Sequence, residues 1–305
     1  MNPLVSVIIP NYNHAKYLNE RIQSVVNQTY KNFEVIIFDD CSKDNSIEII
    51  ENYKNNPKIK HIIYNKENSG STFIQWNKGF DLAQGDYIWI AESDDVADNT
   101  FLEKTVKAIN KNPNTVLVFT NSLFIDSEGK NLNHQCKEIW NTNKIFNGEY
   151  FTRKHMLGMN NIYNASAVLF KKDVIINIPR EKYINYKACG DRIFWIYVCL
   201  QGNIVYLAEK LNKFRKHDNK VSPKAAVSGL SSIEDFKIYS EIKKNVKLNL
   251  IDRILISGFH YGFIHSYPFD KGVKPKLDMM WKNIKEYSFI SYCIYKITRK
   301  LNFIS

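Results

Sequence analysis

The sequence lacks the features of a secreted or membrane-spanning chain. Its five cysteines are odd in number and scattered along 305 residues, and no CxxC or Cys/His spacing suggests zinc. We therefore expect free thiols in a reducing compartment. No window approaches the roughly 18 uninterrupted apolar residues of a transmembrane helix. The N-terminus also has no charged segment and too short an apolar run for a signal peptide. These absences predict a cytoplasmic protein.

Several motifs of common enzyme classes and of nucleic-acid-binding proteins are also missing. The chain contains no GxGxxG after a strand and no GxxxxGK[ST]. It has no GxSxG elbow either. These absences weigh against dinucleotide oxidoreductases, P-loop NTPases and α/β-hydrolases. The net charge of +11 is not accompanied by the motif of a known nucleic-acid-binding module, so nucleic acid is not an expected partner.

The positive charge is concentrated near the C-terminus. Residues 271–305 hold eight Lys or Arg and two acidic residues, which gives a net charge of +6. The predicted helix 286–301 also has an apolar face, formed by Phe289, Ile290, Cys293, Ile294, Ile297 and Leu301. Two interpretations stay open: a peripheral contact with an anionic membrane surface, or a helix packed on the rest of the protein.

The first half of the chain alternates between strand and helix patterns. Short β-branched runs predict strands, and apolar residues at helical spacing predict the helices between them. This alternation is typical of βαβ units and predicts an α/β fold with a mainly parallel central sheet flanked by helices. From about residue 223 the pattern changes to helices. The predicted strands are 5–10, 33–40, 58–65, 86–91, 115–120 and 164–172; the predicted helices between them are 17–28, 46–53, 72–83 and 101–110.

Polar residues follow three of these strands directly. They are Pro10-Asn11-Tyr12-Asn13, Asp39-Asp40 and Glu92-Ser93-Asp94-Asp95. In open parallel sheets, ligands bind beyond the carboxyl ends of the strands. We therefore expect these three segments to converge on one crevice.

The acidic segment 92–95 needs a physical explanation. Three carboxylates in four residues repel one another, and burial makes their ionisation costly. One interpretation is a solvated turn. The other is a site for Mg²⁺ or Mn²⁺, ions that favour oxygen ligands and that hold substrate phosphates in many enzymes.

Other polar residues permit more than one interpretation. Asp40 to Ser46 loosely matches a calcium loop, but a turn and helix N-cap explain Asp44 to Ser46 better. Asp40 could accept a hydrogen bond from a nucleotide base, and Tyr12 could stack on one. Asp191 suits either an N-cap or a general base. His217 suits either a structural role or a metal ligand.

Several stretches taken together resemble glycosyltransferase family 2, whose members have the GT-A fold. They are VSVIIPNYN (5–13), SVVNQTYKNFEVIIFDDCSKDNS (24–46), NSGSTFIQWNKGFDLAQGDYIWIAESDD (68–95), the Gly-Asp pair 190–191 and FRKHDNKVS (214–222). The resemblance implies a GT-A catalytic domain over residues 1–222, followed by a basic, mainly helical extension over 223–305.

The resemblance also implies roles for individual residues. Asp191 matches the catalytic base, Asp95 the acid that holds the divalent metal, and His217 the late histidine near the diphosphate or metal. The remaining matched residues line the pocket of the nucleotide-sugar: Pro10, Tyr12, Asn13, Asp40, Asn68 and Asp94. The expected cofactor is Mn²⁺ or Mg²⁺.

The resemblance implies an inverting transferase that moves a sugar from a nucleoside-diphosphate sugar. The first candidate for this donor is a UDP-sugar. The expected acceptor is a glycan or a lipid-linked glycan in surface polysaccharide biosynthesis, on the inner face of the plasma membrane. The alternatives are a non-catalytic sugar-nucleotide-binding or assembly protein and a nucleotidyltransferase. Two departures concern the donor site: Glu92 replaces the usual Asp, and Gln75-Trp76-Asn77 replaces Ala-Arg-Asn, which removes an arginine.

Overall fold

The computed structural model describes residues 2–132, 140–158, 160–217 and 221–300, and the chain forms two compact units. The first unit comprises residues 1–146, 164–184 and 201–217, and the second comprises 147–163, 185–200 and 218–305. The segment 223–305 thus lies in the second unit, together with two shorter stretches that precede it in the chain. The boundary between catalytic domain and extension at residue 222 remains a prediction.

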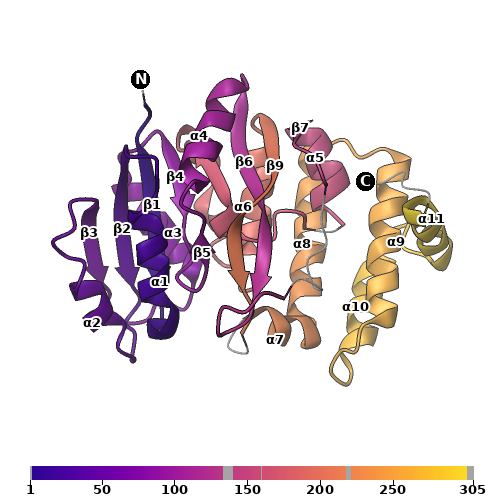
Figure 1. The fold of residues 1–305 in the computed structure, drawn as a ribbon. Coiled ribbons are helices and arrows are strands. Elements are labelled where there is room, and N and C mark those ends of the chain that lie inside the picture. Colours follow the sequence, from indigo (N-terminus) through magenta and orange to yellow (C-terminus); the bar gives the residue numbers. More distant parts are fainter. Residues whose placement is uncertain (1, 133–139, 159, 218–220, 301–305) are drawn as a thin grey trace. The chain divides into compact units, whose positions relative to one another are not determined.

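The first unit is built on a nine-stranded sheet with the order β3-β2-β1-β4-β8-β6-β9-β5, and β7 pairs with β9 (Figure 1). Neighbouring strands are parallel in β3-β2-β1-β4 and in β6-β9, whereas β8 and β5 run antiparallel to their neighbours. The strands are β1 (Val5–Asn11), β2 (Phe33–Asp39), β3 (Ile59–Tyr64), β4 (Tyr87–Ile90), β5 (Val96–Ala97), β6 (Thr115–Ile125), β7 (Lys144–Asn147), β8 (Val168–Lys171) and β9 (Asn203–Arg215).

Strands β1, β2 and β4 consist mostly of residues that are apolar on both faces of the sheet. Every residue of β1, β2 and β4 is buried, as expected for a parallel sheet covered on both sides. In the register of this sheet, Asn11 at the end of β1 pairs with Asp39 at the end of β2. The carboxyl ends of these strands therefore lie at one edge, where the polar residues 11–13, 39–40 and 92–95 follow.

Among its described residues, the first unit has the α-helices α1 (Ala15–Val26), α2 (Ser46–Glu51), α3 (Thr72–Leu82) and α4 (Phe101–Lys111). Helix α1 buries Leu18, Ile22 and Val25 against the sheet, as its helical spacing predicts. Helix α3 lies so close to β1 that a Cβ atom on Gly79 would be 2.7 Å from the Ile8 side chain. The glycine is therefore what permits this helix–strand approach.

The predicted fold class is confirmed: a mixed, mostly parallel sheet with flanking helices, followed by C-terminal helices. Two details differ from the sequence-based expectation. The strand expected at 164–172 is shorter, because 165–167 form a 3-10 turn before β8. The long strand β9 was not expected, since LAEKLNKFR mixes charged and apolar residues without a regular period.

The second unit is helical. Besides a π-helix at Thr152–Met156, it contains α5 (Gly148–Phe151), α6 (Gly190–Cys199), α7 (Val221–Val227), α8 (Leu230–Asn245), α9 (Leu250–Ser266), α10 (Val273–Lys282) and α11 (Phe289–Lys300). Helix α9 begins with a capping box, in which the Asn249 side chain accepts from the Asp252 backbone and Asp252 accepts from the Asn249 backbone. No helix among the described residues is both long and apolar enough to span a bilayer.

Helix α11 packs on α9 through two glycines rather than through its apolar face. A Cβ atom on Gly258 would be 2.2 Å from the backbone oxygen of Ser291, and one on Gly262 would be 2.4 Å from the Tyr292 ring. The large apolar side chains of α11 are instead exposed, by 61% for Phe289, 71% for Ile290, 39% for Ile294 and 59% for Ile297. The apolar face of this helix is thus solvent-facing.

Candidate active site

The loops after β1 and β2 are joined by buried polar side chains. Asn11 Nδ2 donates to Asp39 Oδ2 at 2.9 Å, and the Ser42 backbone donates to Asp39 Oδ1 at 2.9 Å. Asn13 lies in the left-handed region at φ 53°, and its side chain accepts from the Lys43 backbone at 2.7 Å. Asp39 therefore organises the loops. Pro10 is buried within β1, whereas Tyr12 is 44% exposed and presents its ring to solvent.

Asp40 is buried and holds the loop that precedes α3. Its carboxylate accepts from Gln75 Nε2 at 2.8 Å, from Asn65 Nδ2 at 2.6 Å and from Ser69 Oγ at 2.7 Å. The Asn68 side chain donates to the Asp40 backbone oxygen at 3.1 Å. The predicted residues Asp40 and Asn68 are therefore brought together. Ser69 is a partner that the sequence did not single out, because it does not stand at a strand end, and Gln75 was noted only as a departure from the family pattern.

Glu92 begins the acidic segment, and its side chain contacts Trp76. Trp76 Nε1 donates to Glu92 Oε1 at 3.0 Å. Burial, helped by the neighbouring charge of Asp94, raises the pKa of Glu92 to about 8 against the opposing effect of the Trp76 hydrogen bond. At neutral pH Glu92 is therefore mostly protonated, which lowers the negative charge of the segment.

Two buried arginines, one before the acidic segment in the sequence and one after it, donate hydrogen bonds to this segment. Arg21 of α1 donates through Nε to the Glu92 backbone oxygen at 2.8 Å. Arg215, at the end of β9, donates through Nε to the Asp94 backbone oxygen at 2.8 Å, and its backbone donates to Asp95 Oδ1 at 2.9 Å. The pKa of Arg21 is lowered by burial and raised by the charges of Asp95 and Asp94. The segment is thus a braced turn with cations beside it.

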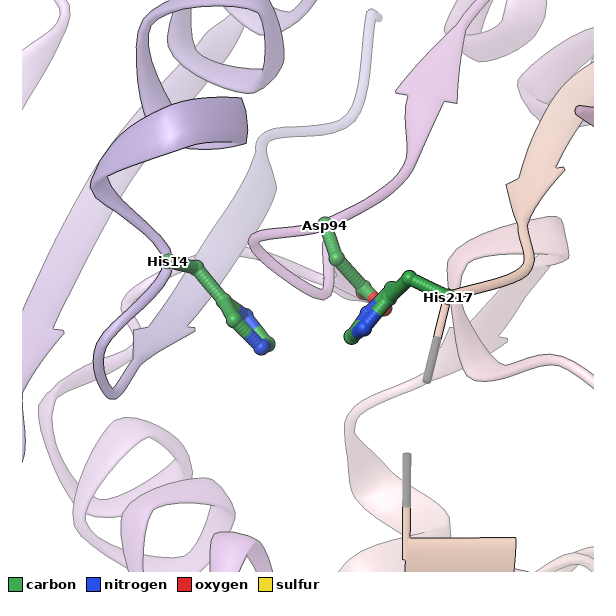
Figure 2. Close-up of side chains that lie close together, drawn as sticks. All are labelled: His14, Asp94 and His217. Carbon is green, nitrogen blue, oxygen red and sulfur yellow. The ribbon is translucent and has the colours of Figure 1, made fainter. Parts of the chain in front are cut away.

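Three side chains of types that can bind a metal ion lie close together at the same edge of the sheet. His14, Asp94 and His217 each offer one ligand atom, and these atoms lie within 4.8 Å of one another. His217 Nε2 is 3.0 Å from Asp94 Oδ2. Figure 2 shows the two imidazole rings pointing toward each other beside the Asp94 carboxylate. His14 was not predicted, because its place just before α1 resembles an ordinary helix start.

The metal role predicted for Asp95 stays a prediction. Its Oδ1 atom accepts from the Arg215 backbone, and Asp95 is not part of the group that His14, Asp94 and His217 form. The geometry instead favours Asp94, which was assigned to the nucleotide-sugar, as the carboxylate beside His217. The acidic segment therefore contains one acid tied to β9 and one turned toward two imidazoles.

Asp191 belongs to the second unit, in the first turn of α6. Cys189 occupies the N-cap position, so Asp191 is not the cap of this helix. Its Oδ1 atom accepts from the Arg192 backbone at 2.7 Å, and burial raises the pKa of Asp191 to about 6. Glu234 of α8 fixes the approach to α6 by accepting from the backbones of residues 187–189. An acid with this pKa is mostly ionised at pH 7 and able to take up a proton.

The sequence matches a known protein family. The family model described as glycosyl transferase family 2 matches residues 6–173. An uncharacterized glycosyltransferase of Haemophilus influenzae is 36% identical over 186 residues, which cover 60% of this chain and 69% of that protein. The chondroitin synthase of Escherichia coli is 35% identical over 128 residues, which cover 42% of this chain and 18% of the synthase.

Solved structures share the fold. The structure of residues 1–349 of S. aureus TarS in complex with UDP-GlcNAc superimposes with a TM-score of 0.61 at 17% identity, covering 98% of this chain and 92% of that one. The mannosyltransferase PcManGT from Pyrobaculum calidifontis, in complex with GDP-Man and Mn²⁺, gives 0.60 at 12% identity, covering 99% and 81%. At these identities the likeness supports the fold alone. The family model matches more than half of the chain, and the chain therefore belongs to glycosyl transferase family 2 and is a transferase.

Proposed function

We propose that the protein is an inverting glycosyltransferase that moves a sugar from a nucleoside-diphosphate sugar to a hydroxyl group of a glycan or lipid-linked glycan. The observation that carries this proposal is the set of polar side chains at the carboxyl edge of β1, β2 and β4. There Asp40, Asp94 and His217 lie in one unit with their partners fixed by hydrogen bonds. This edge is where open α/β sheets bind nucleotides.

The donor is proposed to be a UDP-sugar, lying along the loops that follow these strands. Tyr12 supplies an exposed ring for stacking on the base, and Asn13, Asn68 and Asp40 line the same loops. The TarS structure that shares the fold holds UDP-GlcNAc. The role in surface polysaccharide synthesis is proposed because the chain is similar to part of a chondroitin synthase.

The residues present fit a divalent cation. Asp94 and His217 would hold it, with Asp95 as the further acid of the segment, and two of the three are already in contact. When bound, Mn²⁺ or Mg²⁺ supplies positive charge to the leaving nucleoside diphosphate. A structure with the same fold was solved with Mn²⁺.

Asp191 is the proposed general base. Because burial holds its pKa at about 6, the carboxylate is ionised at neutral pH and still basic enough to accept the proton of the acceptor hydroxyl. The hydroxyl oxygen then forms a bond to the anomeric carbon from the face opposite the diphosphate. The bond to the diphosphate oxygen breaks in the same displacement, and the configuration inverts.

The first test is calorimetric titration of UDP, GDP, dTDP and CDP into the protein, once with Mn²⁺ and once with EDTA. We expect metal-dependent binding of UDP and weaker binding of the other three. A panel of UDP-sugars with product analysis then follows. Release of UDP supports transfer, whereas release of pyrophosphate would identify a nucleotidyltransferase instead. Tight binding of another nucleotide would correct the donor base and leave the reaction class intact.

The acceptor side is proposed to include an anionic membrane surface. Helix α11 presents Ile290, Ile294 and Ile297 to solvent, with a spacing that puts them on one face. Basic residues Lys296, Arg299 and Lys300 lie on the same helix, in a region of net charge +6. An apolar face with basic residues beside it is typical of helices that lie at a bilayer interface.

This contact is tested by co-sedimentation with vesicles of neutral lipid and of lipid containing phosphatidylserine. The triple variant Ile290→Ser, Ile294→Ser, Ile297→Ser should pellet far less with the anionic vesicles than the unaltered protein. Its helix packing should survive, because α11 is seated through Ser291 and Tyr292. Equal pelleting of both proteins would remove the membrane proposal without affecting the donor assay.

A further inference from the structure

We propose that His14 is a third ligand of the metal, so that two imidazoles and one carboxylate form a centre that favours transition ions over Mg²⁺. The inference rests on the proposed function only in placing the ion beside the donor diphosphate. It adds a residue from the first loop of the chain and narrows the cofactor to Mn²⁺ rather than Mg²⁺.

The geometry brings three distant segments to one point. His14 stands just before α1, Asp94 lies in the turn after β4, and His217 follows β9. Their ligand atoms lie within 4.8 Å of one another, and the closest printed pair is 3.0 Å apart. Ligands bound about 2.0–2.2 Å from one ion are roughly 3 Å apart when adjacent and about 4 Å apart when opposite. Small side-chain rotations therefore suffice for one ion to reach all three.

The ring of His14 is held in place by its neighbours. Its Nδ1 atom lies 2.8 Å from the hydroxyl oxygen of Ser93, a buried residue of the acidic segment. A histidine that binds a metal through one nitrogen usually donates the other N–H to a hydrogen-bond acceptor, which fixes both tautomer and orientation. We therefore assign Nε2 as the ligand atom of His14. The ring also meets that of His217 edge to face, with centroids 5.5 Å apart.

His217 is positioned by ring packing. Its ring lies 5.3 Å from the ring of Tyr17, and Tyr17 is covered on its face by the guanidinium of Arg215 at 4.7 Å. Arg215 is in turn bonded to the backbone of Asp94. The two histidines and the carboxylate are thus positioned by residues that also brace the acidic segment, as expected for a preorganised ligand set.

The ligand set decides which ion is favoured. Mg²⁺ is a hard ion that takes oxygen ligands and loses its water reluctantly, so two imidazole nitrogens suit it poorly. Imidazole suits first-row transition ions, with affinity rising from Mn²⁺ through Co²⁺ in the usual order. Three protein ligands leave coordination positions open for diphosphate oxygens. The site should therefore bind Mn²⁺ and Co²⁺ more tightly than Mg²⁺.

The experiment is pulsed electron paramagnetic resonance of Mn²⁺ bound to the full-length protein, which counts coordinated ¹⁴N nuclei. We expect two nitrogens in the unaltered protein and one in His14→Ala and in His14→Gln. The Gln variant keeps a polar side chain at the start of α1 in case Ala disturbs the loop. His61→Ala, on β3 of the same unit, is the control and should keep two nitrogens.

Titrations of Mn²⁺ and Mg²⁺ accompany the spectra. Mn²⁺ should bind roughly 100-fold more tightly than Mg²⁺, and this preference should fall about tenfold in His14→Gln. One coordinated nitrogen in the unaltered protein, equal affinity for both ions, or no bound Mn²⁺ would overturn the inference. Sugar transfer is assayed separately. Sugar transfer by a protein whose Mn²⁺ has one nitrogen ligand would support the proposed function and overturn the role of His14. Two nitrogen ligands without sugar transfer would support the role of His14 and overturn the proposed function.

Discussion

In the first unit, polar side chains lie buried at the sheet edge and are bound by other groups, whereas in the second unit four large apolar side chains of α11 face solvent. The first arrangement fixes small polar ligand atoms to within a fraction of a hydrogen-bond length, which suits a nucleotide and an ion. The second exposes apolar side chains on one face of a helix, with basic residues on the same helix. The two units therefore differ in kind: one has buried, hydrogen-bonded polar side chains, and the other has exposed apolar ones.

The acidic side chains sharpen this comparison. In the first unit, Asp94 and Asp95 lie beside two arginines, and Asp40 accepts hydrogen bonds from at least three side chains. In the second unit, Asp191 accepts from the Arg192 backbone, and burial raises its pKa to about 6. Asp40, Asp94 and Asp95 thus lie among cations and hydrogen-bond donors, whereas Asp191 has a raised pKa, a property that it shares with Glu92 of the first unit.

The largest expected effect follows from Asp191. In Asp191→Asn, sugar transfer should fall by about 10³-fold or more, since the amide cannot accept a proton, while the dissociation constant for UDP stays within about twofold. In the unaltered enzyme, transfer should decline as pH falls through about 6, because the carboxylate becomes protonated. The rate is measured at saturating donor between pH 5 and 8. Full activity of the Asn variant would end the assignment of the base.

The next effect concerns the packing of the second unit. Gly258→Val should reduce the free energy of unfolding by about 3 kcal/mol, because the added side chain meets the Ser291 backbone, which cannot rotate away. Gly262→Ala is the matched comparison and should cost less, since it meets the movable ring of Tyr292. Urea denaturation measures both. A smaller loss for Gly258→Val than for Gly262→Ala would show that α11 is seated differently.

The acidic segment allows a direct comparison of two neighbours. Asp94→Ala should weaken Mn²⁺-dependent UDP binding by about 100-fold, since it removes the carboxylate beside His217. Asp95→Asn keeps an oxygen for the Arg215 backbone and should leave that binding nearly unchanged if Asp94 is the ligand. Calorimetry with and without Mn²⁺ decides. The reverse ranking would restore Asp95 as the metal ligand.

The smallest expected effect is on pH-dependent stability. Burial raises the pKa of Glu92 from 4.5 to about 8, so the folded protein keeps a proton that the unfolded chain loses above pH 4.5. Its contribution to stability therefore falls as pH rises from about 4.5 to 8. Glu92→Gln removes this dependence, so its stability relative to the unaltered protein should rise between pH 5 and 8. Melting temperatures in EDTA at both pH values test it, and a constant difference would contradict the shifted pKa.

Much of the fold could be predicted because its signals are local. The runs at 5–10, 33–40 and 86–91 are long enough and apolar enough to be strands, and the rule for parallel sheets then brings their carboxyl ends together. Asp40, Asp94 and His217 were singled out on that basis or by resemblance. All three belong to the first unit, and Asp94 and His217 are in contact, but their functional roles stay predictions.

The remaining parts of the site depend on contacts between distant segments. Arg215 meets Asp94 and Asp95 across more than 100 residues, and no local pattern encodes that meeting. In the sequence, His14 resembles an ordinary residue at the start of a helix. Arg21 resembles an ordinary residue beside the apolar stripe of that helix. The direction in which the apolar face of α11 points was also undetermined, because two glycines on another helix decide it.

The seating of α11 on glycines has a consequence for how this protein can change over time. Ser291 and Tyr292 of α11 pack against Gly258 and Gly262 of α9. The residues that pack α11 on α9 are therefore different from the apolar residues that α11 exposes to solvent. Substitutions at positions 290, 294 and 297 therefore carry little cost in folding free energy. The apolar character of this surface and the folding stability of the protein therefore depend on different residues. Selection or engineering can alter the surface without lowering the stability.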